Sequence, residues 1–296
     1  MTDLLEQLSA SLADRLVASG SFVVAVRTGH RDYSGILWRP DVVVTSEQVL
    51  PQGTSFTIAH AGTELPATLA GRDPGTNVAA LRLSRPLDGS APSADSSPHA
   101  GSLTLVVGAD SRGAPTGRLA MLHAVGPAWH SEARGRIDAL LRLDTRFGSD
   151  EGGAVLTLAG RLIGMSTSGP RRRALAIPAS TIERVLNPLL SEGRVARGWL
   201  GVALQQVRVP ERMRDAAGRD AGMMVIGLAP TSPAEQAGVL PGDIVLEVDG
   251  KQTGRARGLA SVLTPERIGE PVTLKLLRAG DIRLVTVIIG TQPAKE

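Results

Sequence analysis

The sequence is built from short, β-rich apolar runs that glycine, proline and serine residues separate. The clearest are 22–26 (FVVAV), 42–44 (VVV), 103–107 (LTLVV) and 140–143 (LLRL). Runs of this kind favour an all-β pair of barrels over an α/β sheet. The segment 87–102 is rich in Ser, Pro and Ala and predicts the link between the two barrels.

Length and composition exclude several classes of protein and of site. The 296 residues leave room for about two domains. Cysteine is absent, so disulfides and thiolate-held metals are excluded. The five histidines lack the spacing of a ligand set, so we expect no metal and no cofactor. A net charge of +3 argues against a nucleic-acid partner, and no run is long enough to cross a bilayer.

The first twenty residues predict a short amphipathic helix. Asp3 and Glu6 suit a capping box, Gly20 suits a helix stop, and five leucines form a stripe at helical spacing: Leu4, Leu5, Leu8, Leu12 and Leu16. This helix either packs against its own barrel or docks onto another subunit or protein. Because a basic start and a continuous apolar core are missing, the segment does not resemble a secretion signal, and we expect a cytoplasmic protein.

Five segments resemble the framework of trypsin-like serine proteases of the HtrA type. The segment 43–49 (VVTSEQV) is similar to the family's V-V-T-N-A-H-V, 71–79 (GRDPGTNVA) to G-x-D-P-x-x-D-(I/L)-A, and 147–155 (FGSDEGGAV) to x-x-G-N-S-G-G-(P/A)-L. Segments 160–165 and 174–178 match the two strands that follow the last motif. The resemblance implies that Gln48, Asn77 and Glu151 occupy the positions of the catalytic histidine, aspartate and serine.

These three side chains have the wrong chemistry for a serine protease triad. Gln48 carries an amide, which has no proton equilibrium and cannot be a general base. Asn77 lacks the negative charge that stabilises an imidazolium, and Glu151 offers a carboxylate where a hydroxyl nucleophile is required. The sequence therefore predicts no enzyme, with catalytic residues absent. The alternative is an active serine-type peptidase with a rearranged site, although neither Ser46 nor Ser149 has a histidine at the required spacing.

The C-terminal third resembles the PDZ module that HtrA proteins carry after their protease domain. The run 232–250 (SPAEQAGVLPGDIVLEVDG) nearly reproduces the family's S-P-A-x-x-A-G-(L/V)-x-x-G-D-x-I-x-x-(V/I)-(N/D)-G, and 197–202 (RGWLGV) precedes it. In such domains a peptide adds as an extra strand and backbone N–H groups hold its terminal carboxylate. The resemblance assigns the carboxylate-holding loop to Trp199, Leu200 and Gly201, and the start of the strand that pairs with the peptide to Val202. It places three helix residues on the far side of the groove: Leu259, Val262 and Leu263. The competing interpretation is that these apolar side chains belong to the domain core.

The prediction is a mainly β chain in three parts: an N-terminal helix over 1–20, a trypsin-like double β-barrel over 21–190, and an α+β PDZ domain over 197–292. Its expected function is that of an inactive HtrA-like pseudoprotease that binds a polypeptide or protein partner through the PDZ domain and the barrel surface. Adaptor, scaffold, chaperone-like holder and subunit of a larger complex are the roles in question, and a C-terminal carboxylate in the PDZ groove is the expected mode of binding.

Overall fold

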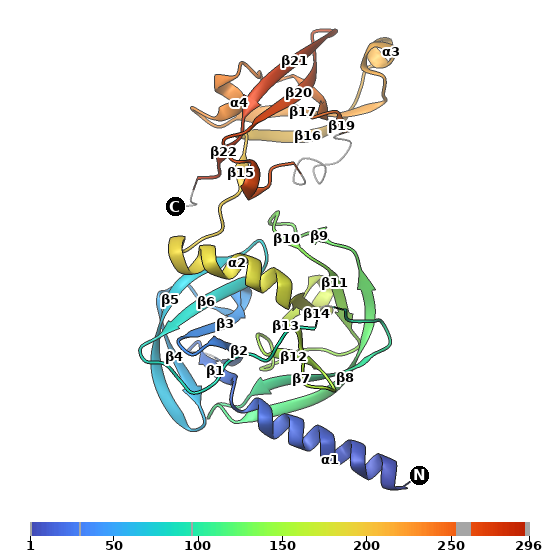
Figure 1. Ribbon diagram of the computed structural model, residues 1–296. Coiled ribbons are helices and arrows are strands. Elements are labelled where there is room, and N and C mark those ends of the chain that lie inside the picture. Colours follow the sequence, from blue (N-terminus) through green and yellow to red (C-terminus); the bar gives the residue numbers. More distant parts are fainter. Residues whose placement is uncertain (1, 30, 96, 253–261, 294–296) are drawn as a thin grey trace. The chain divides into compact units, whose positions relative to one another are not determined.

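The computed structural model describes residues 2–29, 31–95, 97–252 and 262–293 (Figure 1). The chain divides into two compact units, Met1–Val195 and Ala196–Glu296. The first unit holds helix α1 (Thr2–Ser19), two closed barrels and helix α2 (Ala179–Glu192). The second holds one larger sheet, a two-stranded sheet and short helices. The predicted fold class, a trypsin-like double barrel with a PDZ domain and an N-terminal helix, is confirmed.

The first barrel is antiparallel, with the strand order β1-β2-β3-β6-β5-β4. Its strands are β1 (Val23–Arg27), β2 (Asp32–Arg39), β3 (Val42–Ser46), β4 (Ser55–His60), β5 (Thr63–Asp73) and β6 (Val78–Leu83). All five residues of β3 are buried. Residues of this barrel share one apolar core with residues of the second barrel and of α2, which explains why several strands are continuous apolar runs.

The second barrel has the order β11-β14-β13-β12-β7-β8. Its strands are β7 (Leu103–Ala109), β8 (Pro115–Gly126), β11 (Leu140–Leu143), β12 (Ala154–Thr157), β13 (Leu162–Ser168) and β14 (Ala174–Pro178). A small hairpin of β9 (Trp129–His130) and β10 (Arg136–Ile137) leads into β11. The segment between β6 and β7 connects the two barrels, as its composition predicts.

The two helices of the first unit pack through apolar stripes. In α2 the stripe is Ile182, Val185, Leu186 and Leu189, at helical spacing, and all four side chains are fully buried. In α1, Leu12 and Leu16 pack against the barrel core, and Leu16 covers Gly117 of β8, where a Cβ atom would come within 2.9 Å of it. The remaining leucines of the predicted stripe, Leu4, Leu5 and Leu8, are exposed. Among the described residues, no helix combines the length and the apolar character that crossing a membrane requires.

The second unit is built on a sheet in which β16 is an edge strand, with the order β16-β17-β18-β20-β21 and β19 paired to β18. Its elements are β15 (Gly198–Trp199), β16 (Val202–Arg208), α3 (Arg214–Ala217), β17 (Ala221–Leu228), α4 (Pro233–Gln236), β18 (Ile244–Val248), β19 (Lys251–Gln252), β20 (Pro271–Arg278), β21 (Asp281–Ile288) and β22 (Gly290–Thr291). Ser232 caps α4 by accepting the N–H of Glu235, as expected for Ser before Pro at a helix start.

Candidate functional site

The three positions that the resemblance assigns to a catalytic triad come together in one hydrogen-bonded network. Gln48 lies in a single 3₁₀ turn, Glu47–Val49, directly after β3 of the first barrel. Asn77 lies in the turn between β5 and β6, and Glu151 in the loop between β11 and β12 of the second barrel. The network therefore joins the two barrels, since Gln48 and Glu151 are 103 residues apart in sequence.

Asn77 fixes the first-barrel side of the network. Its φ of 58° is in the left-handed region, which asparagine tolerates better than most residues. From there its Oδ1 accepts the backbone N–H of Gln48 at 2.8 Å. Its Nδ2 donates to Ser46 Oγ at 3.0 Å and to Thr167 Oγ1 at 2.6 Å. Asn77 thus holds the backbone of Gln48 and one hydroxyl from each barrel.

Glu151 is the centre of the network, with only 7% of its surface exposed. Its Oε1 accepts from Gln48 Nε2 and, at 3.1 Å, from the backbone N–H of Ser168. Its Oε2 accepts from the hydroxyl of Ser168 at 2.8 Å. Among the described residues this carboxylate accepts hydrogen bonds from uncharged donors and forms no salt bridge, so hydrogen bonds rather than an ion pair stabilise the buried group.

The network also contains three hydroxyl residues, Ser46, Thr167 and Ser168, and the sequence pointed to only the first of them as a candidate site residue. Ser46 is close enough in sequence to Gln48 to be considered as a candidate nucleophile. Thr167 and Ser168 were not identified, although they end β13, which follows directly from the recognised segment 160–165. The signal that could have found them is the run of hydroxyl residues 166–168, whose side chains alternate between the two faces of a strand.

Hydrogen bonds within the loop and close packing against Ser34 hold the segment that carries Glu151. Gly148 donates its N–H to Asp150 Oδ1 at 2.6 Å, and Glu151 donates its N–H to the carbonyl of Gly148 at 3.3 Å. Gly152 has a φ of 88°, and a Cβ atom there would lie 2.2 Å from the carbonyl oxygen of Ser34. The N–H of Glu151, one of the groups that would face an oxyanion in a trypsin-like protease, is therefore already bonded within the loop.

Burial also affects the residue that precedes Gln48. Desolvation raises the pKa of Glu47 above its ordinary value, against the opposing effect of Arg72, and the nearby Asp73 raises it further. The Nη1 atom of Arg72 lies 3.5 Å from Glu47 Oε1.

In the described part of the chain, no group of three or more His, Asp or Glu side chains is placed to hold a metal ion.

Four of the PDZ residues named from the sequence, 199–202, lie at the start of the edge strand β16. Gly201 has a φ of 78°, and a Cβ atom there would lie 2.1 Å from Ser232 Cβ, so the position requires glycine. The carbonyls of Leu200 and Gly201 accept the N–H groups of Ala234 and Ala229 at 2.9 and 2.8 Å. These bonds fix the loop against α4 and the end of β17.

The apolar residues assigned to the groove differ in burial. Leu200 and Val262 are 2% and 3% exposed, so their side chains belong to the core of this unit. Val202 and Leu263 are half-buried and pack against that core from its edge. Trp199 is half-buried in β15, and Leu259 lies outside the described residues.

Both units match known families. Residues 33–165 match the trypsin-like peptidase domain, and residues 198–289 match the PDZ domain. The order of the two is the one that the sequence motifs predict. In both units the chain is similar to HtrA-type proteins. Its HtrA-like fold is matched by solved structures, among them the HtrA-type protease AlgW with decapeptide (TM-score 0.76, 21% identity, 96% of this chain and 99% of that chain). A second is the serine endoprotease from Yersinia pestis (TM-score 0.74, 23% identity, 96% and 98%).

Curated relatives are longer than this chain. A probable periplasmic serine endoprotease, DegP-like, of Rhizobium meliloti is 30% identical over 262 residues, which cover 85% of this chain and 51% of that protein. The similarly named protein of Halomonas elongata is 32% identical over 276 residues, with 85% and 54% covered. The chain thus spans about half the length of the curated relatives it matches.

These relatives correct two of the sequence-based predictions. The expectation that the chain is no enzyme is contradicted, because the relatives are named serine endoproteases. At the positions that the resemblance assigns to the triad, Gln48, Asn77 and Glu151 lack the groups of the usual histidine–serine mechanism, but other mechanisms do not require those groups. The expectation of a cytoplasmic location is contradicted as well, because the relatives are named periplasmic. The missing basic start and apolar core in the first twenty residues were not enough to predict the cellular location.

Proposed function

We propose that this HtrA-like protein works in the periplasm and binds polypeptides, with the PDZ unit holding the C-terminal end of the bound chain. The observation that carries the proposal is the edge position of β16, which follows directly on the loop of Leu200 and Gly201. An edge strand offers unpaired backbone groups to an added strand. The structural neighbour AlgW was solved with a decapeptide and with a tripeptide, which agrees with this proposal.

The recognition of a chain end is tested with matched peptides that end in an apolar residue, one with a free carboxylate and one amidated. Amidation removes the charge that the loop N–H groups satisfy, so binding should weaken by about 1.5–3 kcal/mol. Fluorescence anisotropy on the full chain measures both affinities. Equal binding of acid and amide would exclude carboxylate recognition.

A glycine pair provides the matched control for the loop. Gly201→Ala places a Cβ atom 2.1 Å from Ser232 Cβ at a positive φ, and should reduce peptide affinity. Gly227→Ala, in β17 of the same unit, places its Cβ atom no closer than 3.8 Å to any neighbour and should leave the affinity unchanged. Loss of binding in both variants, or in neither, would contradict the placement of the peptide end at the Leu200–Gly201 loop.

The trypsin-like unit carries a second candidate function, hydrolysis of polypeptides at a rearranged serine-type centre. The specific observation is the bond of 2.8 Å from the Ser168 hydroxyl to Glu151 Oε2, inside the network of the three triad positions. A carboxylate in that contact can take the hydroxyl proton as Ser168 Oγ attacks a peptide carbonyl, and can return it to the leaving amine. Water would then hydrolyse the ester of Ser168. Gln48 would hold the carboxylate in place without exchanging a proton.

The peptidase candidate is tested with an unfolded protein substrate and a fluorophosphonate label. Hydrolysis by the wild-type chain should be lost in Ser168→Ala and in Glu151→Gln, and the label should map to Ser168. Ser191→Ala is the matched control, because that exposed hydroxyl bonds within α2, to the carbonyl of Asn187. Absence of hydrolysis in the wild-type chain refutes this candidate without touching the peptide-binding proposal, and hydrolysis that survives in Ser168→Ala refutes the role of that serine.

A further inference from the structure

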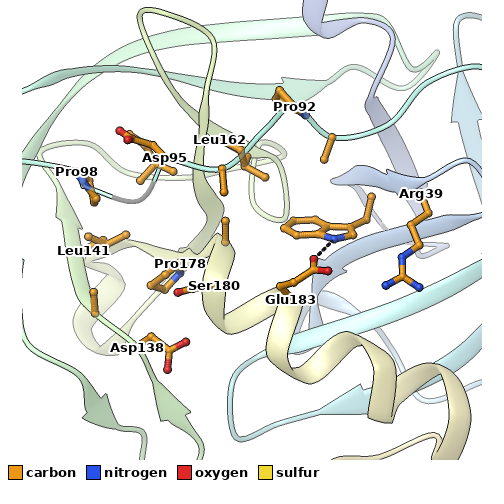
Figure 2. A pocket seen from close by; sticks show the side chains of 16 residues that line it. Arg39, Pro92, Asp95, Pro98, Asp138, Leu141, Leu162, Pro178, Ser180 and Glu183 are labelled. Atoms are coloured by element: carbon orange, nitrogen blue, oxygen red, sulfur yellow. Dashed lines mark hydrogen bonds between the residues drawn. The ribbon is translucent and has the colours of Figure 1, made fainter.

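The first unit contains a cavity of about 670 Å³ that shares no residue with the Glu151 network (Figure 2). It lies between the end of β2, the segment that connects the two barrels, and the start of α2. Its volume is in the range of small-molecule sites in proteins, which are about 300–1,000 Å³. No part of the proposed peptide binding or hydrolysis uses this cavity.

One side of the cavity is apolar. Leu141, Leu162 and Pro178 are buried residues of the second barrel, and proline and alanine residues of the connecting segment complete the wall. Two carboxylates on the lining are already neutralised by arginines. Asp95 lies 3.2 Å from Arg161, and Asp138 lies 3.3 Å from Arg184.

The opposite side carries two charged side chains, Glu183 and Arg39, and each forms a hydrogen bond with an uncharged side chain. Glu183 Oε2 accepts the indole N–H of Trp38 at 2.8 Å, the dashed contact in Figure 2, and Arg39 Nη2 donates to Asn187 Oδ1 at 2.9 Å. Among the described residues, neither Glu183 nor Arg39 takes part in a salt bridge. Figure 2 shows both side chains on the side of the cavity away from Leu141 and Pro98.

The helix sets the spacing of these two charges. Glu183 and Asn187 are four residues apart in α2, so their Cβ atoms lie about 5–6 Å apart on one face. Because Arg39 bonds to Asn187 and Trp38 bonds to Glu183, the end of β2 places Arg39 beside the same face of α2 that carries Glu183. An ammonium and a carboxylate on one carbon can bond to two such partners at once.

We propose that this cavity is a binding site for a small zwitterion with an apolar body, of the class of apolar α-amino acids. Glu183 binds the ammonium group, Arg39 binds the carboxylate, and the wall of Leu141, Leu162 and Pro178 receives the apolar side chain. Charge complementarity at one side and apolar surface at the other decide the orientation of the ligand.

The test uses L-phenylalanine as the zwitterion, 2-phenylethylammonium as its cation-only analogue and 3-phenylpropionate as its anion-only analogue. Trp38 lines the cavity and reports binding by fluorescence in the full chain with Trp129→Phe and Trp199→Phe. L-phenylalanine should saturate with a dissociation constant of about 1 mM or below, as its size allows. Each analogue should bind at least about tenfold more weakly, because one charge pair is missing.

Charge-neutral variants identify the residues. Glu183→Gln and Arg39→Gln should each weaken the binding of L-phenylalanine about tenfold or more. Glu192→Gln removes an exposed carboxylate from the last turn of the same helix and should have no effect. The proposal is overturned if L-phenylalanine does not saturate below about 50 mM, if the three probes bind alike, or if Glu183→Gln and Arg39→Gln bind as the Glu192→Gln control does.

Discussion

The pair of Asp243 and Arg278 should stabilise the PDZ unit unequally, according to which partner is removed. Arg278 donates from Nε to Asp243 Oδ1 and from Nη2 to Oδ2, both at 2.7 Å. Asp243 also accepts the N–H of Leu240 at 2.8 Å. Only 1% of the Asp243 side chain is exposed, against 31% of Arg278. The hydrogen bond to Asp243 raises the pKa of Arg278 above its ordinary value, so the guanidinium is charged throughout the accessible pH range.

Replacing Arg278 leaves a carboxylate in the interior without a counter-ion, while replacing Asp243 leaves a guanidinium that can turn into water. Arg278→Met should therefore lower the free energy of unfolding by about 3–5 kcal/mol. Asp243→Asn removes the charge but keeps an oxygen for Leu240, and should lower it by about 1–2 kcal/mol. The double variant should lose less than Arg278→Met alone, because no buried charge is left over.

Urea unfolding of the full chain measures these differences. Trp199 reports on the PDZ unit when Trp38 and Trp129 are replaced by Phe. Arg283→Met is the control, since its contact with Asp281 joins side chains that are 61% and 75% exposed. Two results would contradict this reasoning: equal losses of unfolding free energy in Arg278→Met and Asp243→Asn, or a double variant that is less stable than both single variants. Either would show that burial of the Asp243 carboxylate does not determine the free energy of unfolding.

Three further outcomes follow from packing and charge, all measured by urea unfolding of the full chain. Leu189→Ala empties a fully buried position of α2 and should lower the free energy of unfolding by about 2–5 kcal/mol, whereas Leu4→Ala, on an exposed side chain, should change it by less than about 0.5 kcal/mol. Gly71→Ala places a Cβ atom 2.5 Å from the carbonyl oxygen of Leu189 and should destabilise the first unit by about 1–3 kcal/mol; an unchanged unfolding midpoint would mean that the helix is not held this close. For Asp249, burial alone raises the pKa, but the N–H of Thr273 and the side chain of Arg267 outweigh it and the pKa is lowered from 3.8. The stability from this group is present above pH 3.8 and is lost as the pH falls through the lower folded value, so Asp249→Asn should flatten the acid limb of the stability curve.

The sequence by itself determined the architecture, because the architecture depends on local patterns. Short apolar runs with Gly, Pro and Ser between them specify strands and turns, and the glycines of 232–250 mark turns with a positive φ, which other residues rarely adopt. The leucine stripe located α1, but it did not decide which leucines are covered. Leu12 and Leu16 pack on the barrel while Leu4 and Leu5 are exposed, since that depends on where the helix meets β8.

The chemistry of the candidate sites could be seen only in the folded protein, because it depends on contacts between segments that are separate in the sequence. The residue types at Gln48 and Glu151 follow from the sequence, but the contact between Gln48 and the Glu151 carboxylate follows from the packing of one barrel against the other. The Ser168 hydroxyl reaches the same carboxylate because the loop after β11 folds onto the end of β13 within the second barrel. In the same way, Arg39 and Glu183 are 144 positions apart, and it is the packing of β2 beside α2 that places both on one cavity. A sequence pattern fixes neighbours along the chain, whereas a charge pair or a hydrogen bond across the fold exists only once the barrels have closed.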